Sequence, residues 1–114
     1  MINGQQVALV SGSTKGIGKA IAQQLVLDGY IVVQNSRSTI APEEVIGHYY
    51  LRADVTIETE SRMLVQKVIE KYGKLDLLVC NVGSGKAFFI QISNSEMLSQ
   101  FLSINLNSTT NLVD

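Results

Sequence analysis

The sequence predicts an α/β fold built on a doubly wound parallel sheet, and three observations support this prediction. Short apolar segments of strand type alternate with longer segments whose apolar residues recur at helical spacing. A glycine-rich turn joins the first apolar segment to the first helical one. The composition, 46% hydrophobic and 17% charged over 114 residues, is that of a globular chain. We therefore expect one domain over residues 1–114, with helices on both faces of a parallel sheet.

The first part of the chain supplies two strands and a helix. Residues 7–10 are an apolar run bounded by turn residues, which is typical of a strand buried on both faces. A helix is expected from about residue 16 to residue 28, because Gly29 is a natural C-terminal stop. The β-branched run 30–34 predicts the second strand. A polar loop follows, and Pro42 favours a short helical turn up to residue 46.

The middle of the chain predicts a third strand and a second helix. Residues 48–53 form the strand, and Thr56 is the expected cap of a helix over about 57–72. Acidic residues in the first turns favour this start, and Gly73 ends the helix. Its inward face would consist of Ile57, Ser61, Leu64, Val65, Val68, Ile69 and Tyr72.

A fourth strand is expected over residues 75–80, followed by a polar loop up to Lys86. Residues 87–92 are apolar, but their pattern alone assigns them to neither a helix nor a strand, and a last helix is expected from about residue 96. The doubly wound rule gives the strand order 3-2-1-4, with a ligand crevice where the order reverses between strands 1 and 4. The fourth strand would be an open edge of this partial sheet and would favour self-association.

Charge and composition narrow the classes of partner. The formal net charge is −1, so neither a nucleic acid nor a membrane surface is expected as a partner. No apolar run approaches membrane-spanning length, and the N-terminal residues do not resemble a signal peptide. The single cysteine, Cys80, ends an apolar run, which indicates buried packing and fits a cytoplasmic setting. His48 has no companion at metal-ligand spacing, so no metal site is expected.

The residues with the clearest chemistry lie in the turn after the first strand. Gly12, Gly16 and Gly18 follow the pattern G-x-x-x-G-x-G, with Ser11 in front. A strand that leads through glycines into a helix presents free N–H groups and the positive end of the helix dipole to an anion. A dinucleotide pyrophosphate is the usual ligand. The alternative is a glycine-rich turn between a strand and a helix that binds nothing.

This turn resembles the TGxxxGxG turn of the short-chain dehydrogenase/reductase family, with Ser11 in place of the usual Thr. The resemblance implies a Rossmann-like fold and an enzyme that transfers a hydride between a nicotinamide cofactor and a small carbonyl or alcohol substrate. It covers nearly the whole chain but only the N-terminal half of the family. It implies that the pyrophosphate and the nearby phosphates are bound by Gly12, Ser13, Lys15, Gly16, Ile17 and Gly18.

The end of the second strand bears on the choice of cofactor. NAD sites usually place an acid there, whereas this chain has Asn35, Ser36 and Arg37. A carboxylate would repel a 2′-phosphate, and a guanidinium binds it with charge-assisted hydrogen bonds. Lys15 would add a second positive charge, and family members that prefer NADP(H) look similar at both positions. The sequence therefore predicts NADP(H) over NAD(H). The alternative is that both residues are solvated surface charges.

Asp54 and Val55 close the third strand. In the family, an Asp at this place hydrogen-bonds the exocyclic amine of adenine, and the next residue packs on the ring. The resemblance therefore implies an adenine site at these two residues. A helix cap or first-turn acid near Thr56 is an equally good interpretation of Asp54, and both roles are compatible.

Asn81 and Gly83 match the second Asn and the Gly of the family motif NNAG, and the resemblance implies that they line the cofactor path. The other two positions depart from the motif. Cys80 replaces the first Asn and loses its hydrogen bonds, and Val82 is bulkier than the usual Ala.

Asn105 is the one position that the resemblance marks as catalytic, because the family carries there an Asn that joins a proton relay to the catalytic Lys. An Asn on a partly exposed helix face is the alternative. The family's Ser and Tyr-x-x-x-Lys pair are not present, since none of the four Tyr residues is followed four places later by Lys. We therefore interpret the chain as the cofactor-binding half of an enzyme that is a homo-oligomer at full length. A non-catalytic dinucleotide-binding module or an inactive fragment is the alternative.

Overall fold

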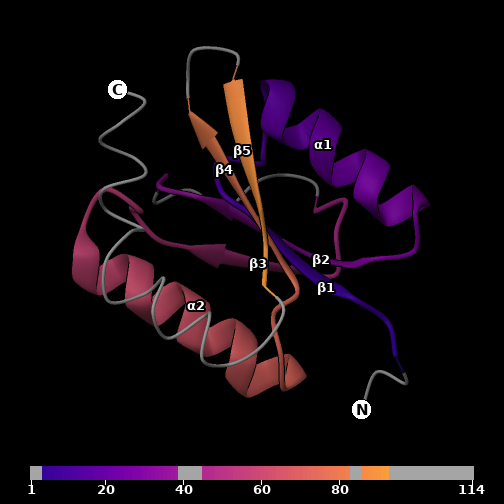
Figure 1. Cartoon of the computed structure of the whole chain (residues 1–114). Helices are drawn as coiled ribbons and strands as arrows, with labels where there is room; N and C mark the ends of the chain where they lie inside the picture. The colour runs from indigo at the N-terminus through magenta and orange to yellow at the C-terminus, as the bar shows by residue number, and fades with distance from the viewer. Residues whose placement is uncertain (1–3, 39–44, 83–85, 93–114) are drawn as a thin grey trace.

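The computed structural model describes residues 4–38, 45–82 and 86–92. These residues form a twisted sheet between two helices, with α1 on one face and α2 on the other (Figure 1). The predicted order of the first four strands is confirmed, and a fifth strand extends it to β3-β2-β1-β4-β5. The elements are β1 (Val7–Val10), α1 (Gly16–Leu27), β2 (Ile31–Ser36), β3 (Tyr49–Arg52), α2 (Glu58–Tyr72), β4 (Leu77–Val82) and β5 (Lys86–Gln91).

The first four strands are parallel, as the alternation of strands and helices predicts. Strand β1 is the centre of the sheet, and its residue Ala8 is in register with Val32 of β2 and with Leu77 of β4. On the far side of β2, Val33 is in register with Tyr49 of β3. The chain order therefore reverses between β1 and β4, and a doubly wound sheet binds its ligands at this reversal.

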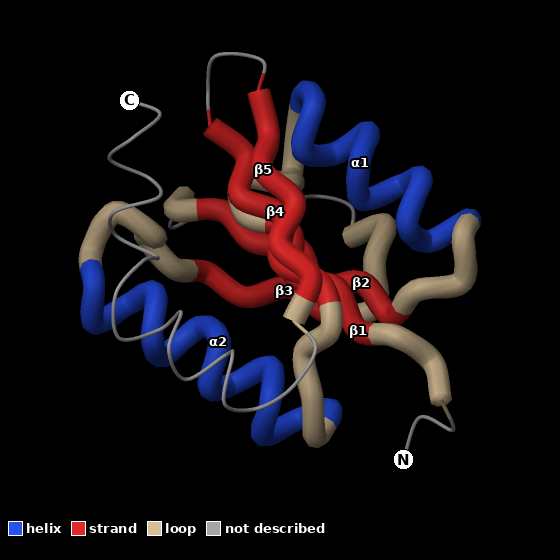
Figure 2. Tube along the Cα trace, in the orientation of Figure 1, coloured by secondary structure: helices blue, strands red, loops and turns tan. Residues whose placement is uncertain are grey.

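The prediction of an open edge at the fourth strand is wrong, because β5 pairs with β4 in antiparallel register from Leu77↔Gln91 to Val82↔Lys86. The two strands lie side by side in Figure 2. Residues 86–91 are rich in aromatic and β-branched types, which favour strands. Ala87 packs on the α1 side of the sheet and Ile90 on the α2 side, as the alternation of a strand requires.

Side chains from both faces of the sheet form the core. Alternate residues of β1 point to opposite faces, with Val7 and Leu9 in the cluster under α2 and Ala8 and Val10 in the cluster under α1. Helix α2 contributes Leu64, Val65 and Val68 to its cluster, and α1 contributes Ala22 and Leu25. Cys80 is buried in the α2 cluster, as predicted, and burial raises the pKa of its thiol to about 11.

The start of α2 differs from the prediction. The N-cap is Ile57, which is 43% exposed and belongs to no inward face. Thr56 is not the cap, because its hydroxyl donates to Asp54 instead. Ser61 is buried at a core position because its hydroxyl donates to the carbonyl of Val55. The expected helical turn after Pro42 falls mostly outside the described residues, and the expected last helix lies outside them entirely.

Candidate functional site

The glycine turn leaves β1 at the reversal of strand order and leads into α1. Gly12 and Gly16 have φ angles of +58° and +64°, which side chains of other residues rarely adopt. Gly18 is needed for a different reason, because a Cβ atom on it would lie 2.2 Å from the carbonyl oxygen of Gly12. All three predicted glycines are therefore required by the path of the backbone itself.

The end of β4 holds this turn from one side. The side-chain amide of Asn81 donates to the carbonyl of Gly12 at 3.0 Å, and its backbone N–H donates to the hydroxyl of Ser11 at 3.1 Å. The backbone N–H of Ser11 in turn donates to the carbonyl of Val79. Asn81 thus lies beside the turn, where its role in lining the cofactor path stays a prediction. Gly83, predicted for the same path, lies outside the described residues.

The end of β2 holds the turn from the other side through Ser13. The buried hydroxyl of Ser13 donates to the carbonyl of Val10 at 2.7 Å and accepts from the backbone N–H of Asn35 at 2.9 Å. The backbone N–H of Ser13 donates to the carbonyl of Asn35 at 2.8 Å. The side chain of Ser13 therefore supports the turn from within. Direct contact between Ser13 and a phosphate stays a prediction.

Two buried amide side chains complete this support, and sequence reasoning missed both. Gln34 donates to the carbonyl of Ser13 and accepts from the backbone N–H groups of Ile46 and Gly47. Asn35 has a similar linking role, since its amide nitrogen donates to the carbonyls of Leu51 and Ala53 and its oxygen accepts from the N–H of Gly12. The available signal was a pair of amide residues at the end of an otherwise apolar strand.

The N-terminus of α1 is open to an anion. Its N-cap is Lys15, which makes no side-chain capping bond, and the first turn contains no acidic residue. The first N–H groups of a helix have no partner within the helix, and they meet the positive end of its dipole. Lys15, Gly16 and Ile17 are all exposed there, beside the supported turn.

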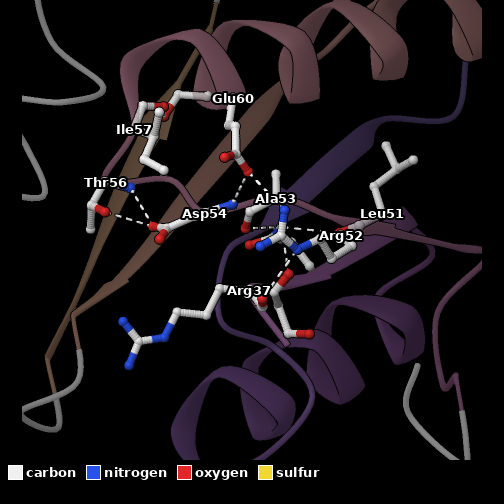
Figure 3. A network of polar contacts seen from close by, with 11 residues as sticks. Arg37, Leu51, Arg52, Ala53, Asp54, Thr56, Ile57 and Glu60 are labelled. Atoms are coloured by element: carbon white, nitrogen blue, oxygen red, sulfur yellow. Dashed lines mark hydrogen bonds and ion pairs between the residues drawn. The ribbon is translucent and has the colours of Figure 1, made fainter. Parts of the chain in front are cut away.

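The ends of β2 and β3 place Arg37 and Asp54 at the same edge of the sheet (Figure 3). Asp54 Oδ1 accepts hydrogen bonds from the hydroxyl and the backbone N–H of Thr56, at 2.6 and 3.0 Å. These two bonds, with smaller contributions from Arg37 and Arg52, lower the pKa of Asp54 below its usual range. Asp54 is therefore neither the cap of α2, which is Ile57, nor one of its first-turn acids, which are Glu58 and Glu60, so that interpretation is wrong. Its contact with adenine stays a prediction.

The structure thus brings most of the predicted site residues to the carboxyl ends of the four parallel strands, β3, β2, β1 and β4. Val55 is half-buried and packs against the α2 core, while Asn105 lies outside the described residues. Within the part of the chain that the structure describes, no group of three or more His, Cys, Asp or Glu residues is arranged to hold a metal ion. No helix in the same part is both long and apolar enough to cross a bilayer.

A doubly wound sheet with a glycine turn at the reversal of strand order defines the Rossmann-like class of α/β folds. A family model described as short chain dehydrogenase matches residues 6–114. The chain belongs to this family. It is 39% identical over 116 residues to a short-chain dehydrogenase/reductase of Armillaria gallica, and the match covers 91% of the chain and 44% of that relative. The chain therefore spans less than half the length of this relative.

Solved structures agree with the fold. One is an F189W actinorhodin polyketide ketoreductase with NADPH, which is 33% identical with a TM-score of 0.61. The match covers 73% of this chain and 34% of that one. Another is an NADH-dependent reductase complexed with NAD, which is 30% identical with a TM-score of 0.62. This second match covers 74% of this chain and 39% of the reductase chain. The cofactors named for these similar proteins thus include both NADPH and NAD.

Proposed function

We propose that this chain is the cofactor-binding half of an NADP(H)-dependent short-chain oxidoreductase. The full-length protein, a homo-oligomer, would transfer a hydride between the nicotinamide and a carbonyl or alcohol carbon of a small-molecule substrate. The observation that carries the proposal is the uncapped, acid-free N-terminus of α1 next to a turn that the ends of β2 and β4 hold in place. Family membership supports the type of reaction.

The pyrophosphate would lie against the glycine turn and the first turn of α1. Gly16 supports this position, because none of the described residues outside its chain neighbours and its own helix backbone has a heavy atom within 4 Å of the place where its Cβ would be. The backbone can therefore be approached closely, and the exposed N–H groups can donate to phosphate oxygens. Lys15 adds a positive charge beside them. When bound, the cofactor would supply a nicotinamide that donates or accepts the hydride, while these residues would bind and orient its phosphates.

Arg37 would bind the 2′-phosphate that distinguishes NADP(H) from NAD(H). Among the described residues, no hydrogen bond or ion pair engages its guanidinium, which points away from the neighbouring ion pair in Figure 3. The side chain that precedes it by two places is the neutral, buried amide of Asn35, so the end of β2 itself places no carboxylate beside the phosphate. A guanidinium matches the geometry of a phosphate well and stays charged at every relevant pH.

The test is a fluorescence titration of the purified chain and of Arg37→Gln with NADPH and NADH. Loss of a charged hydrogen bond typically costs about 2 kcal/mol, so we expect Arg37→Gln to weaken NADPH binding by at least about tenfold and to leave NADH unchanged. Arg62→Gln is the matched control, since Arg62 is exposed on α2 and pairs with Glu58. Tighter binding of NADH by the unaltered chain would overturn the cofactor preference. Absence of binding to both would favour an inactive fragment.

A non-catalytic dinucleotide-binding module is the second candidate, because no Tyr of this sequence is followed by Lys four places later. The two candidates share the cofactor site and differ in the catalytic pair. Reading the coding sequence beyond the codon for Asp114 distinguishes them. A Ser followed by Tyr-x-x-x-Lys supports the enzyme, and a stop codon supports the module.

A further inference from the structure

Arg52, the last residue of β3, joins two segments that follow neighbouring strands. Its Nε donates to the backbone carbonyl of Arg37 at 3.1 Å, and its Nη1 donates to Oε1 of Glu60 at 3.0 Å (Figure 3). Because the donors of a guanidinium are fixed in one plane, the two bonds set the position of the Arg37 backbone relative to α2.

The same carboxylate oxygen of Glu60 also accepts a hydrogen bond from the backbone N–H of Asp54, at 2.9 Å. Oε1 of Glu60, near the start of α2, therefore bonds directly to the segment after β3 and is connected through Arg52 to the segment after β2. These two segments carry Arg37, to which the proposed function assigns the 2′-phosphate, and Asp54, for which the family resemblance implies contact with the adenine.

We propose that Arg52 and Glu60 are positioning residues for the adenosine end of the cofactor. They hold the backbones of Arg37 and Asp54 at a fixed separation. The guanidinium of Arg37 can then contact the 2′-phosphate while the segment of Asp54 contacts the adenine. This inference rests on the proposed function, from which it takes the role of Arg37, and on the adenine contact that the family resemblance implies for Asp54. Neither Arg52 nor Glu60 needs to touch the cofactor.

A second ion pair, which lies wholly on α2, shows how this role differs from that of an ordinary surface ion pair. Arg62 and Glu58 also form a pair at 3.0 Å, with side chains 44% and 57% exposed. The side chains of Arg52 and Glu60 are 45% and 29% exposed, so both pairs contribute little to the free energy of unfolding. The pair of Arg62 and Glu58 links residues one turn apart on a single helix, whereas Arg52 and Glu60 connect three segments of the chain.

Glu60→Gln gives a test in which positioning and simple electrostatics predict opposite signs. The exchange removes a negative charge near the proposed phosphate site, so electrostatics alone would tighten the binding of a 2′-phosphate. Gln keeps the length of the side chain but is a weaker acceptor for Arg52 and for the Asp54 N–H. If the pair positions Arg37, the affinity for the 2′-phosphate instead falls.

The probes are adenosine 2′,5′-bisphosphate and 5′-AMP, which differ only in the 2′-phosphate, measured by calorimetry on the 114-residue chain. For Glu60→Gln and for Arg52→Gln we expect binding of the bisphosphate to weaken by about tenfold and that of 5′-AMP by about threefold. The double variant should lose little more than either single one, since both exchanges break the same connection. Glu58→Gln and Arg62→Gln are the matched controls and should bind like the unaltered chain.

Hydrogen exchange of the Asp54 amide provides a readout that needs no ligand, and it should become faster in both variants but in neither control. Equal or tighter binding of the bisphosphate by Glu60→Gln, or unchanged exchange at Asp54, would overturn the positioning role while leaving the proposed function in place. If the unaltered chain binds neither probe and neither dinucleotide, the proposed function fails, and the positioning role fails with it.

Discussion

The side-chain amide of Asn81 donates a 3.0 Å hydrogen bond to the carbonyl oxygen of Gly12, which joins the end of β4 to the turn after β1. The nitrogen of this amide would also lie 2.7 Å from a Cβ on Gly18. Asn81 therefore fills the space beside the turn as well as bonding it. Its position makes the shape of the turn depend on the pairing of β1 with β4.

Exchange of Asn81 for Ala should loosen the turn. It removes one hydrogen bond, so we expect the free energy of unfolding to fall by about 1 kcal/mol and NADPH binding to weaken several-fold. Urea unfolding and a fluorescence titration measure the two effects. Gln91→Ala, at an exposed residue of β5, is the control. Unchanged binding by Asn81→Ala would show that the turn keeps its shape without this bond.

Gly18→Ala should be more damaging than Gly16→Ala. The added methyl at residue 18 meets the carbonyl of Gly12, and relief of such a clash typically costs about 1–3 kcal/mol. At residue 16 the space is open, and only the φ of +64° opposes a side chain, at a cost of about 1 kcal/mol. Urea unfolding of both variants shows which exchange lowers the free energy of unfolding more. The reverse order would contradict the close packing of α1 against its own turn.

Gln34→Leu should destabilise the fold although it adds an apolar side chain to a buried site. The exchange leaves the carbonyl of Ser13 and the N–H groups of Ile46 and Gly47 without their partner. Each buried unsatisfied group costs about 1–3 kcal/mol, so we expect a loss of at least about 2 kcal/mol in urea unfolding. Gln66→Leu, at an exposed position of α2, is the matched control and should change stability by less than about 0.5 kcal/mol.

The ordinary pKa of an Asp is about 3.9, and the Thr56 hydroxyl lowers that of Asp54 in the folded state. The folded state then binds this proton more weakly than the unfolded state. The resulting stabilisation is present above the unfolded value and is lost as pH falls through the folded pKa. We therefore expect Thr56→Val to be less stable than the unaltered chain at pH 7, with a difference that shrinks below about pH 4.

Urea unfolding at a series of pH values from neutral to acidic measures this difference. Thr59→Val is the control, because Thr59 is an exposed threonine of α2 with no bond to Asp54. A difference between Thr56→Val and the unaltered chain that stays constant with pH would show that the Asp54 carboxyl is not its source.

The sequence predicted the parts of this fold that depend on local signals. Glycines with positive φ, such as Gly12 and Gly16, leave a pattern that is independent of the rest of the chain. The buried run of β1 and the inward residues of α2 are likewise visible from periodicity. These signals were sufficient for the order of the first four strands and for the location of the turn.

The parts that sequence reasoning missed depend on partners distant in the chain. Gln34 is buried because it meets backbone groups of Ser13 on one side and of Ile46 on the other, and no local pattern predicts that pairing. Strand β5 pairs only because the edge of β4 is available beside it. The connection made by Arg52 and Glu60 was missed for the same reason, since it forms only when β3 and α2 are both in place.

The antiparallel pairing of β4 with β5 has a consequence for the order in which the sheet assembles. Val82 pairs with Lys86, so this hairpin closes a very short loop, whereas the pairing of Ala8 with Leu77 must close most of the chain. Short loops lose less chain entropy on closure, and a hairpin forms within about 1–10 μs. We therefore expect β5 to cover the outer edge of β4 before β1 docks on the other side. During that interval β4 exposes one edge rather than two to other unfolded chains.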